Sequence, residues 1–177
     1  MKGAVVWFTG YSGSGKSTLA ERLCAHLRGL GQLVELLDGD ALRAQAPKIG
    51  FSKADRDQHV RRTGLAAADL EGRGVVAVAA LISPYAEARN YVRGLCRNFI
   101  EIHVTTPLEV CRRRDPKGLY ARAARGELKG LTGVDDPYEH PETPDLAIDA
   151  SRSGVDEAAA TVIRFVEARL GLHGTSR

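Results

Sequence analysis

A glycine-rich segment at residues 10–18, GYSGSGKST, constrains this chain more than any other feature. It matches the pattern G-x-x-x-x-G-K-[S/T], which ends here in Lys16 and Ser17. Glycines let backbone N–H groups turn inward around phosphate oxygens, the lysine reaches the β- and γ-phosphates of a nucleotide, and the hydroxyl ligates Mg²⁺. An apolar run at 4–9 precedes the segment, and leucines at helical spacing follow it. We therefore predict a strand, a phosphate-binding loop and a helix.

Length and composition are those of an ordinary globular protein. The chain has 177 residues, 44% of them hydrophobic, so we expect one domain over 1–177. The net charge of +3 suits an anionic small molecule and is too small to indicate nucleic acid. No apolar run approaches the roughly 20 residues of a membrane span. The three scattered cysteines are typical of reduced thiols, so we expect a cytoplasmic protein without membrane contact.

Apolar runs alternate with helical patterns along the chain. We expect strands at 4–9, 33–37, 75–80, 99–104 and 146–148, and helices at 19–30, 52–71, 86–97, 107–114, 119–125 and 155–170. Nearly continuous apolar strands separated by helices predict an α/β fold: a five-stranded parallel sheet of the P-loop NTPase type, with helices on both faces. The segment 115–144 is rich in glycine, proline and charge, and we expect it to be a mobile lid.

Polar residues follow the second predicted strand, where ligands of such sheets bind. Asp38 and Asp40 flank a glycine, and strand alternation predicts that their side chains point to the same side. One carboxylate could hold Mg²⁺ through its water shell while the other accepts a proton from a hydroxyl group. An ordinary D-G turn is the alternative. Arg43, Arg56 and Arg62 follow and would suit an anionic acceptor, although solvated arginines would give the same pattern.

Three classes of nucleotide-binding protein compete for this pattern. A GTPase should carry an N/T-K-x-D guanine-reading motif, and the sequence has none. A motor ATPase should have a long apolar run that ends in Asp and is followed by a catalytic Glu, which is also absent. A sensor that only binds nucleotide needs no acid–base residues, so the carboxylate pair argues against it. Phosphoryl transfer needs positioning and charge neutralisation, which favours a kinase.

Several segments together resemble the adenylylsulfate (APS) kinase family: GYSGSGKST, LDGDALR, GFSKADRDQHVRR, ISPYAEAR, FIEIHVTTPLEVC and RDPKGLYARAARGELKGLTGVDDPYEHPETP. The resemblance runs from the glycine loop to Ile148. It implies a P-loop fold with a lid, usually as a homodimer. It also implies that ATP, with Mg²⁺, phosphorylates the 3′-hydroxyl of adenosine 5′-phosphosulfate (APS).

The resemblance also implies residue roles. Asp40, Lys16, Lys117 and Asp38 would be catalytic, with Asp40 at the acceptor hydroxyl and Lys117 at the transferring phosphoryl group. ATP and its Mg²⁺ would be bound by Gly10, Ser12, Gly13, Ser14, Gly15, Lys16, Ser17 and Thr18, with Arg114 on the base and Ser17 and Asp38 at the metal. The acceptor would contact Asp40, Arg43, Phe51, Arg56, His59, Arg62, Ile82, Ser83 and Leu131. Ser83 matches a serine that is phosphorylated in some relatives, and a helix N-cap before Pro84 is its alternative role.

Four features depart from the family pattern. His59 stands where the family has Asn, and Leu131 stands where it has the second of two aromatic residues that clamp the acceptor adenine, the first being Phe51. Arg112 replaces a Glu, and the linker between Arg43 and Phe51 is one residue shorter and contains Pro47. All but Arg112 concern the acceptor side. A related 3′-kinase acting on another nucleotide, such as cytidine diphosphoramidate, is therefore the alternative function.

Overall fold

The structure, a computed structural model, describes residues 2–44 and 52–172. Its strands are β1 (Ala4–Thr9), β2 (Val34–Asp38), β3 (Val76–Ala80), β4 (Phe99–Val104) and β5 (Leu146–Ile148). They form one sheet in the order β2-β3-β1-β4-β5, and every pairing is parallel. The helices are α1 (Lys16–Gly29), α2 (Gly39–Ala44), α3 (Lys53–Gly72), α4 (Ala86–Leu95), α5 (Leu108–Arg114), α6 (Leu119–Ala124) and α7 (Gly154–Leu170). The α/β fold with a five-stranded parallel sheet is thus confirmed.

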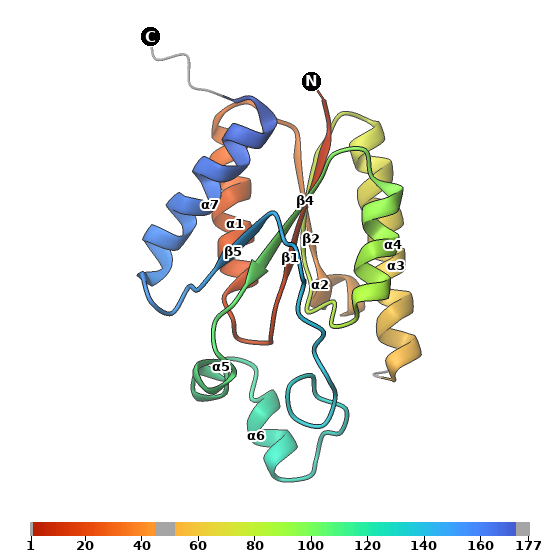
Figure 1. Ribbon diagram of the computed structural model, residues 1–177, viewed down its shortest axis with the longest axis vertical. Coiled ribbons are helices and arrows are strands. Elements are labelled where there is room, and N and C mark those ends of the chain that lie inside the picture. Colours follow the sequence, from red (N-terminus) through yellow and green to blue (C-terminus); the bar gives the residue numbers. More distant parts are fainter. Residues whose placement is uncertain (1, 45–51, 173–177) are drawn as a thin grey trace.

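Helices cover both faces of the sheet, with α1 and α7 on one face and α3 and α4 on the other (Figure 1). The central strand β1 is buried along its whole length, which explains its unbroken apolar sequence. Val6 and Phe8 pack toward α1 and α7, whereas Val5 and Trp7 pack toward α3 and α4. Each such side chain contributes about 1.5–3 kcal/mol when fully buried. The two core clusters fix the carboxyl ends of the strands, where the polar segments emerge.

The sequence missed the short helix α2, and this corrects one prediction. Asp38 is the last residue of β2, and the helix begins at Gly39, so the extended alternation expected for Asp38 and Asp40 does not hold. Asp38 Oδ1 instead accepts hydrogen bonds from the backbone N–H groups of Asp40 and Ala41, at 3.0 and 3.1 Å. The carboxylate therefore caps the helix, and the backbone turns immediately after it.

Other boundaries differ from the predictions by one to three residues, the largest difference being the start of α1 at Lys16 instead of residue 19. Helix α4 ends at Leu95 instead of residue 97, and α5 begins at Leu108, so that Pro107 precedes the helix instead of occupying its first turn. The capping prediction at Ser52 is confirmed, since its side chain and that of Asp55 form a reciprocal capping box. The shortened linker around Pro47 lies outside the described residues.

The predicted lid region contains α6 and then a long irregular segment, which together lie beyond the strand ends (Figure 1). A small apolar cluster of Cys111, Tyr120 and Leu131 supports it from inside. The Tyr120 hydroxyl donates to the backbone oxygen of Ser12, at 2.8 Å, and so attaches α6 to the glycine loop. The backbone N–H of Glu139 donates to Pro84 O at 2.8 Å. The end of the lid region is therefore held against the loop that precedes α4.

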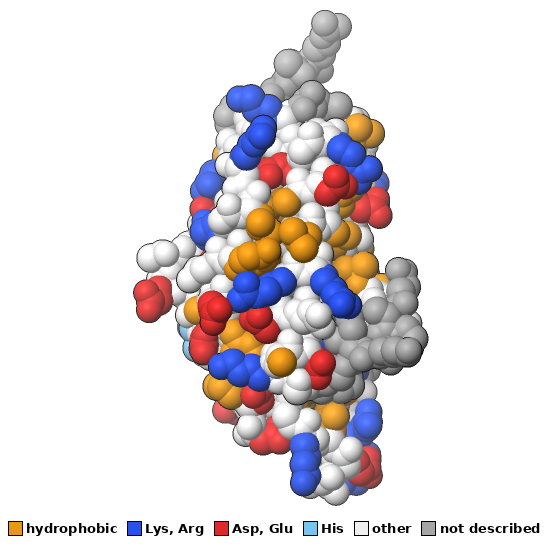
Figure 2. All heavy atoms as spheres, turned by 90° about the vertical axis from the view of Figure 1, so that its right-hand side faces the viewer, with side chains coloured by type: hydrophobic (Ala, Val, Ile, Leu, Met, Phe, Trp, Pro, Cys, Tyr) orange, Lys and Arg blue, Asp and Glu red, His pale blue; other side chains and the backbone are white. Residues whose placement is uncertain are grey.

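The face covered by α3 and α4 carries exposed apolar side chains, which gather near its middle with Lys and Arg side chains around them (Figure 2). Leu65 on α3 and Tyr91 on α4 are among the large exposed hydrophobic residues. Arg61 lies over the Tyr91 ring, 4.4 Å from its centroid, and pairs with Glu87. In the part of the chain that the structure describes, no helix has both the length and the apolar character needed to cross a membrane.

Candidate active site

The glycine loop has the geometry that close contact with phosphate requires. Gly10 has φ of +149°, and a Cβ atom built on it would lie 2.6 Å from the Val104 carbonyl oxygen, so no other residue fits there. Gly15, with φ of +105°, stands immediately before α1. Its left-handed backbone lets the loop turn into the helix, whose first N–H groups remain available to an anion.

Lys16 is the most unusual charge in the site. Its side chain is buried, and its ammonium group donates to Tyr11 O at 2.7 Å. Burial, with the nearby charge of Lys117 as a smaller cause, lowers the pKa of Lys16 to about 8. A polyphosphate would supply the negative charge that this buried ammonium group needs.

Ser17 and Asp38 form the candidate magnesium site. The Ser17 hydroxyl donates to Asp38 Oδ2 at 3.0 Å, which brings together a hydroxyl and a carboxylate from two different elements. These are the hard oxygen ligands that Mg²⁺ accepts, with phosphate oxygens and water completing its shell. Among the described residues, no group of three or more His, Cys, Asp or Glu could hold a metal alone. The residues present therefore fit a magnesium ion that arrives with a nucleotide.

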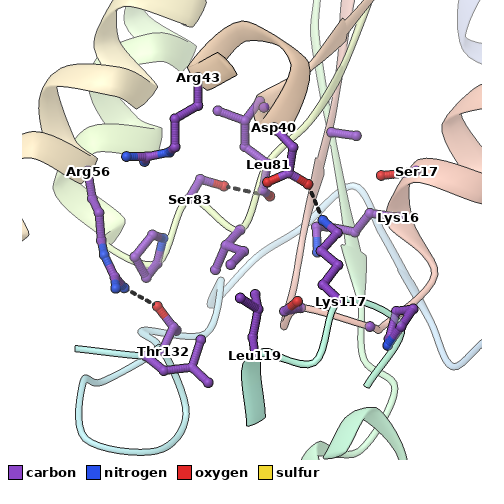
Figure 3. A pocket seen from close by; sticks show the side chains of 18 of the residues that line it. Lys16, Ser17, Asp40, Arg43, Arg56, Leu81, Ser83, Lys117, Leu119 and Thr132 are labelled. Atoms are coloured by element: carbon purple, nitrogen blue, oxygen red, sulfur yellow. Dashed lines mark hydrogen bonds and ion pairs between the residues drawn. The ribbon is translucent and has the colours of Figure 1, made fainter. Parts of the chain in front are cut away.

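A cavity of about 590 Å³ lies beside the loop, and this volume is typical of small-molecule sites. Figure 3 shows Lys16, Asp40 and Lys117 on one side of it and Arg43 and Arg56 on another. Lys117, from the lid region, forms an ion pair with Asp40, which lies in the first turn of α2. The residue predicted to contact the acceptor hydroxyl and the residue predicted to approach the transferring phosphoryl group thus contact each other.

The arginines of the cavity bring positive charge to the acceptor side. Arg56, on α3, contacts Thr132 and Gly130 of the lid region and pairs with Asp136, with 3.1 Å between Nη1 and Oδ2. Burial and the neighbouring charge of Arg56 lower the pKa of Arg43. An anionic substrate would relieve this unfavourable proximity of two guanidinium groups.

His59 and Leu131, the two departures from the family pattern on this side, both line the cavity. His59 Nε2 lies 3.0 Å from the carbonyl oxygen of Gly39, and because a carbonyl only accepts, this nitrogen carries the proton. Burial, followed by the charge of Arg43, lowers the pKa of His59 and so favours the neutral form of the ring. Leu131 is buried, and it belongs to the apolar cluster inside the lid region.

Most of the predicted site residues come together around the cavity. Those that line it are Ser12, Gly13, Gly15, Lys16, Ser17, Thr18, Asp40, Arg43, Arg56, His59, Ile82, Ser83, Arg114, Lys117 and Leu131. Gly10, Ser14 and Asp38 support the loop and the metal site from just outside the lining. Arg62 is exposed on α3 and does not line the cavity. Phe51 lies outside the described residues.

Sequence reasoning missed several residues of the cavity wall. Thr132, Leu119, Leu128, Arg122, Lys129 and Val155 also line it. The first five lie in the segment predicted as a lid, where the excess of basic residues near 122–129 was the available signal for Arg122 and Lys129. Val155 gives no signal, because an exposed Val at the start of a helix is common.

Ser83 takes a conformation that the sequence did not indicate. Its φ is +40°, which residues other than glycine rarely adopt, and its side chain is buried. Helix α4 begins at Ala86, with Tyr85 as the preceding residue, so the prediction that Ser83 caps this helix is wrong. Its hydroxyl accepts from Trp7 Nε1 at 3.1 Å instead. Phosphorylation of Ser83 stays a prediction, and it would require this buried hydroxyl to become accessible.

Comparison with known proteins identifies the family. The family model described as adenylylsulphate kinase matches residues 2–149. The chain belongs to the adenylylsulphate kinase family. It is 50% identical over 165 residues to a probable adenylyl-sulfate kinase of Pyrococcus abyssi, covering 93% of this chain and 95% of that one. It is also 50% identical over 168 residues to the adenylyl-sulfate kinase of Geotalea uraniireducens, covering 93% and 81%.

The fold of this chain is similar to that of solved adenylylsulphate kinase structures. The structure of the Mycobacterium tuberculosis APS kinase CysC in complex with AMPPNP and APS superposes with a TM-score of 0.88. The two sequences are 42% identical, and the match covers 94% of this chain and 98% of that one. A gluconokinase of Sinorhizobium meliloti, 19% identical with a TM-score of 0.60, shares the fold alone.

Proposed function

We propose that this protein transfers the γ-phosphoryl group of ATP to the 3′-hydroxyl of adenosine 5′-phosphosulfate and so forms 3′-phosphoadenosine 5′-phosphosulfate. One observation carries the proposal: the cavity brings the phosphate-loop lysine Lys16, the carboxylate of Asp40 and two arginines together. Family membership and the relatives named as adenylyl-sulfate kinases give the acceptor its identity.

Asp40 is the proposed proton acceptor. Its carboxylate lies in the cavity between the glycine loop and the arginines, and its ion pair with Lys117 shows that a cation can reach it. When the acceptor binds, the 3′-hydroxyl would take the position beside Asp40, and Lys117 would turn to the transferring phosphoryl group. Phosphoryl transfer gains most from such positioning and charge neutralisation.

The glycine loop and Lys16 would hold the ATP phosphates. Bound Mg²⁺, held by Ser17 and by Asp38 through water, supplies charge neutralisation at the phosphate oxygens. Arg114, whose guanidinium lies 3.5 Å from the Gly13 carbonyl oxygen, is close enough to the loop to stack on the ATP base. Arg43 and Arg56 would bind the phosphosulfate group of the acceptor, which carries the complementary charge.

The acceptor distinguishes this proposal from the alternative, a kinase of cytidine diphosphoramidate. The relatives favour APS. The wall at Leu131 is aliphatic, where the family pattern has an aromatic ring. Stacking on such a ring is worth about 1–3 kcal/mol per base, so its absence weakens adenine binding without preventing it. The arrangement of acid–base residues also disfavours a sensor that only binds nucleotide.

The proposal is tested by measuring ADP release with ATP and Mg²⁺ across four acceptors: APS, AMP, cytidine diphosphoramidate and CMP. We expect the highest kcat/KM with APS, because both the adenine and the phosphosulfate find partners. Lys16→Ala is the matched control and should abolish ADP release while leaving the fold intact. A higher kcat/KM with cytidine diphosphoramidate would overturn the assignment of the acceptor. A rate of ADP release that no acceptor increases would contradict the proposal that the protein is a kinase.

The homodimer expected from the resemblance stays a proposal. A hexameric APS kinase from Thiobacillus denitrificans, 38% identical with a TM-score of 0.73, supports assembly in the family. The exposed apolar side chains of Leu65 and Tyr91, on the face formed by α3 and α4, are consistent with a covered surface.

A further inference from the structure

Ile82 and Ser83 line the cavity where the acceptor is proposed to bind, and their backbone must be held in an unusual shape. Within the described residues only Ser83 and Asp115 have positive φ without being glycine. A left-handed residue of this kind persists only where its surroundings fix it. The Thr9 hydroxyl contributes by donating to Ile82 O at 2.7 Å. Its contact with the carbonyl oxygen of Ser83 is longer, at 3.5 Å.

Arg89, on α4, supplies the closest contact to that carbonyl group. Its Nη1 donates to Ser83 O at 2.7 Å, and its Nη2 donates to Glu139 O at 2.6 Å. Its Nε lies 3.2 Å from a carboxylate oxygen of Glu101, on β4. The Arg89 side chain is only 3% exposed and is absent from the cavity lining. The rigid guanidinium group therefore holds two backbone carbonyl groups at a fixed separation. Its ion pair with Glu101 orients the guanidinium group.

The second of these carbonyls belongs to the end of the lid region. The backbone N–H of Glu139 donates to Pro84 O at 2.8 Å, and its side chain accepts from the backbone N–H of Ala86 at 2.6 Å. Glu139 is thus bonded on three sides to residues 84–89. The loop before α4 and the end of the lid region form one hydrogen-bonded unit. The Thr9 hydroxyl also contacts both segments, at Ile82 O and the Tyr138 hydroxyl. Arg89 differs in that it donates to a backbone carbonyl group of each segment.

We propose that Arg89 is a positioning residue that sets the acceptor-side wall of the cavity by holding Ser83 and Glu139 together. The inference rests on the proposed function for its kinetic consequence, because the wall it sets is the one assigned to the acceptor. Arg89 touches no substrate itself. Its loss should weaken acceptor binding more than nucleotide binding, because the groups it bonds to are Ser83, Glu139 and Glu101 and none of them belongs to the glycine loop.

Arg89→Lys is the test, with Arg93→Lys as the matched control. Lysine keeps the charge beside Glu101, but its single ammonium group cannot bridge both carbonyls. Arg93 also pairs with Glu101, at 3.0 Å, but its other contacts are with Asp145 and the Phe99 ring, not with the loop or Glu139. From the value of hydrogen bonds to charged groups, Arg89→Lys should raise KM for APS about 10- to 100-fold. KM for ATP should change less than about twofold, and Arg93→Lys should leave both values near wild type.

Amide hydrogen exchange in the ligand-free protein separates this inference from the proposed function, because it needs no acceptor. We expect faster exchange at Ala86 and Glu139 in Arg89→Lys and wild-type rates in Arg93→Lys. If wild-type protein fails to phosphorylate APS, the proposed function falls while exchange still decides the role of Arg89. Equal exchange in the two variants, or equal increases in KM for APS and ATP, would overturn the inference.

A second variant keeps the test decisive should Arg89→Lys fail to fold. Glu139→Ala removes an exposed side chain, so the core is not disturbed, yet it frees the N–H of Ala86. We expect a few-fold higher KM for APS with KM for ATP unchanged. Unchanged KM for APS in this variant would count against a docked loop that sets the acceptor wall.

Discussion

Lys16 is a buried cation whose partners in the ligand-free protein are neutral. A backbone carbonyl at 2.7 Å and a serine hydroxyl at 3.5 Å are weak substitutes for a counter-ion. Burial accordingly lowers its pKa to about 8. A polyphosphate at the loop favours the protonated form and raises the pKa again. Nucleotide binding is therefore coupled to proton uptake above pH 8.

This coupling predicts how ATP affinity depends on pH. Below pH 8 Lys16 is protonated with and without nucleotide, so affinity should be flat. Above pH 8 only the bound state keeps the proton, so affinity should fall by about tenfold per pH unit until the bound-state pKa is reached. Titration with a non-hydrolysable ATP analogue between pH 7 and 9.5 measures this.

The control for this titration is Lys16→Arg. A guanidinium group stays charged throughout the range, so the variant should show no such slope whatever its absolute affinity. A wild-type affinity that stays constant from pH 7 to 9.5 would mean that Lys16 is fully protonated before nucleotide binds, and the argument from burial would fail.

The junction of β2 and α2 serves structure and chemistry through one side chain. Asp38 caps α2 with one carboxylate oxygen and accepts from Ser17 with the other. Capping needs any acceptor, whereas a magnesium site needs an anionic oxygen. Two substitutions can therefore separate the two roles.

Asp38→Ala should lose both roles, and Asp38→Asn should lose only the charge. We expect Asp38→Ala to reduce stability by about 1 kcal/mol, the usual value of a cap, which corresponds to roughly 2–4 °C in Tm for a protein of this size. Asp38→Asn should keep most of the stability but need a higher Mg²⁺ concentration for half-maximal rate. Thermal unfolding and a Mg²⁺ titration of the rate are the measurements. An unchanged Mg²⁺ requirement in Asp38→Asn would remove Asp38 from the metal site.

Elements with a strong repeating pattern were predictable from sequence, and elements fixed by distant contacts were not. The runs at β1 and β4 are apolar throughout because both faces are buried, and their bounds matched the predictions. Helix α2 has six residues and no buried face, so the sequence shows no hydrophobic periodicity that would predict it. Glu139 attaches the lid region by hydrogen bonds with Ala86 and Arg89, which lie about fifty positions away in the sequence. Local pattern carries no information on such contacts.

The residues of the candidate site likewise fall into those that local sequence predicts and those that it does not. The glycine loop was predictable because its spacing is itself the requirement of phosphate binding. Asp40 and Arg43 were predictable from their place after a strand of a parallel sheet. The positive φ of Ser83 was not, because Trp7 and Arg89, which hold it, come from other elements. Arg122, on the short helix α6, and Lys129, in the irregular segment after it, were missed because charged residues in such places usually face solvent.

At the scale of the whole molecule, the candidate site residues gather at the carboxyl ends of the strands. The glycine loop follows β1, the Asp38–Asp40 segment follows β2, and Ile82 and Ser83 follow β3, so three adjacent strands end at one cavity. The lid region lines the remaining side with Lys117, Leu119 and Thr132 (Figure 3). Donor and acceptor would then lie on opposite sides of Asp40, the geometry needed for in-line transfer.

The position of the transferred phosphate tests this account most directly. Phosphorus NMR of the product formed from ATP, Mg²⁺ and APS should show a new phosphomonoester coupled to the ribose H3′ proton, with the sulfate retained and one ADP released per product. Asp40→Asn should form the same product about 10²- to 10⁴-fold more slowly, the usual cost of removing a positioned acid–base group. Phosphate on another hydroxyl, or free inorganic phosphate as the main product, would contradict the account.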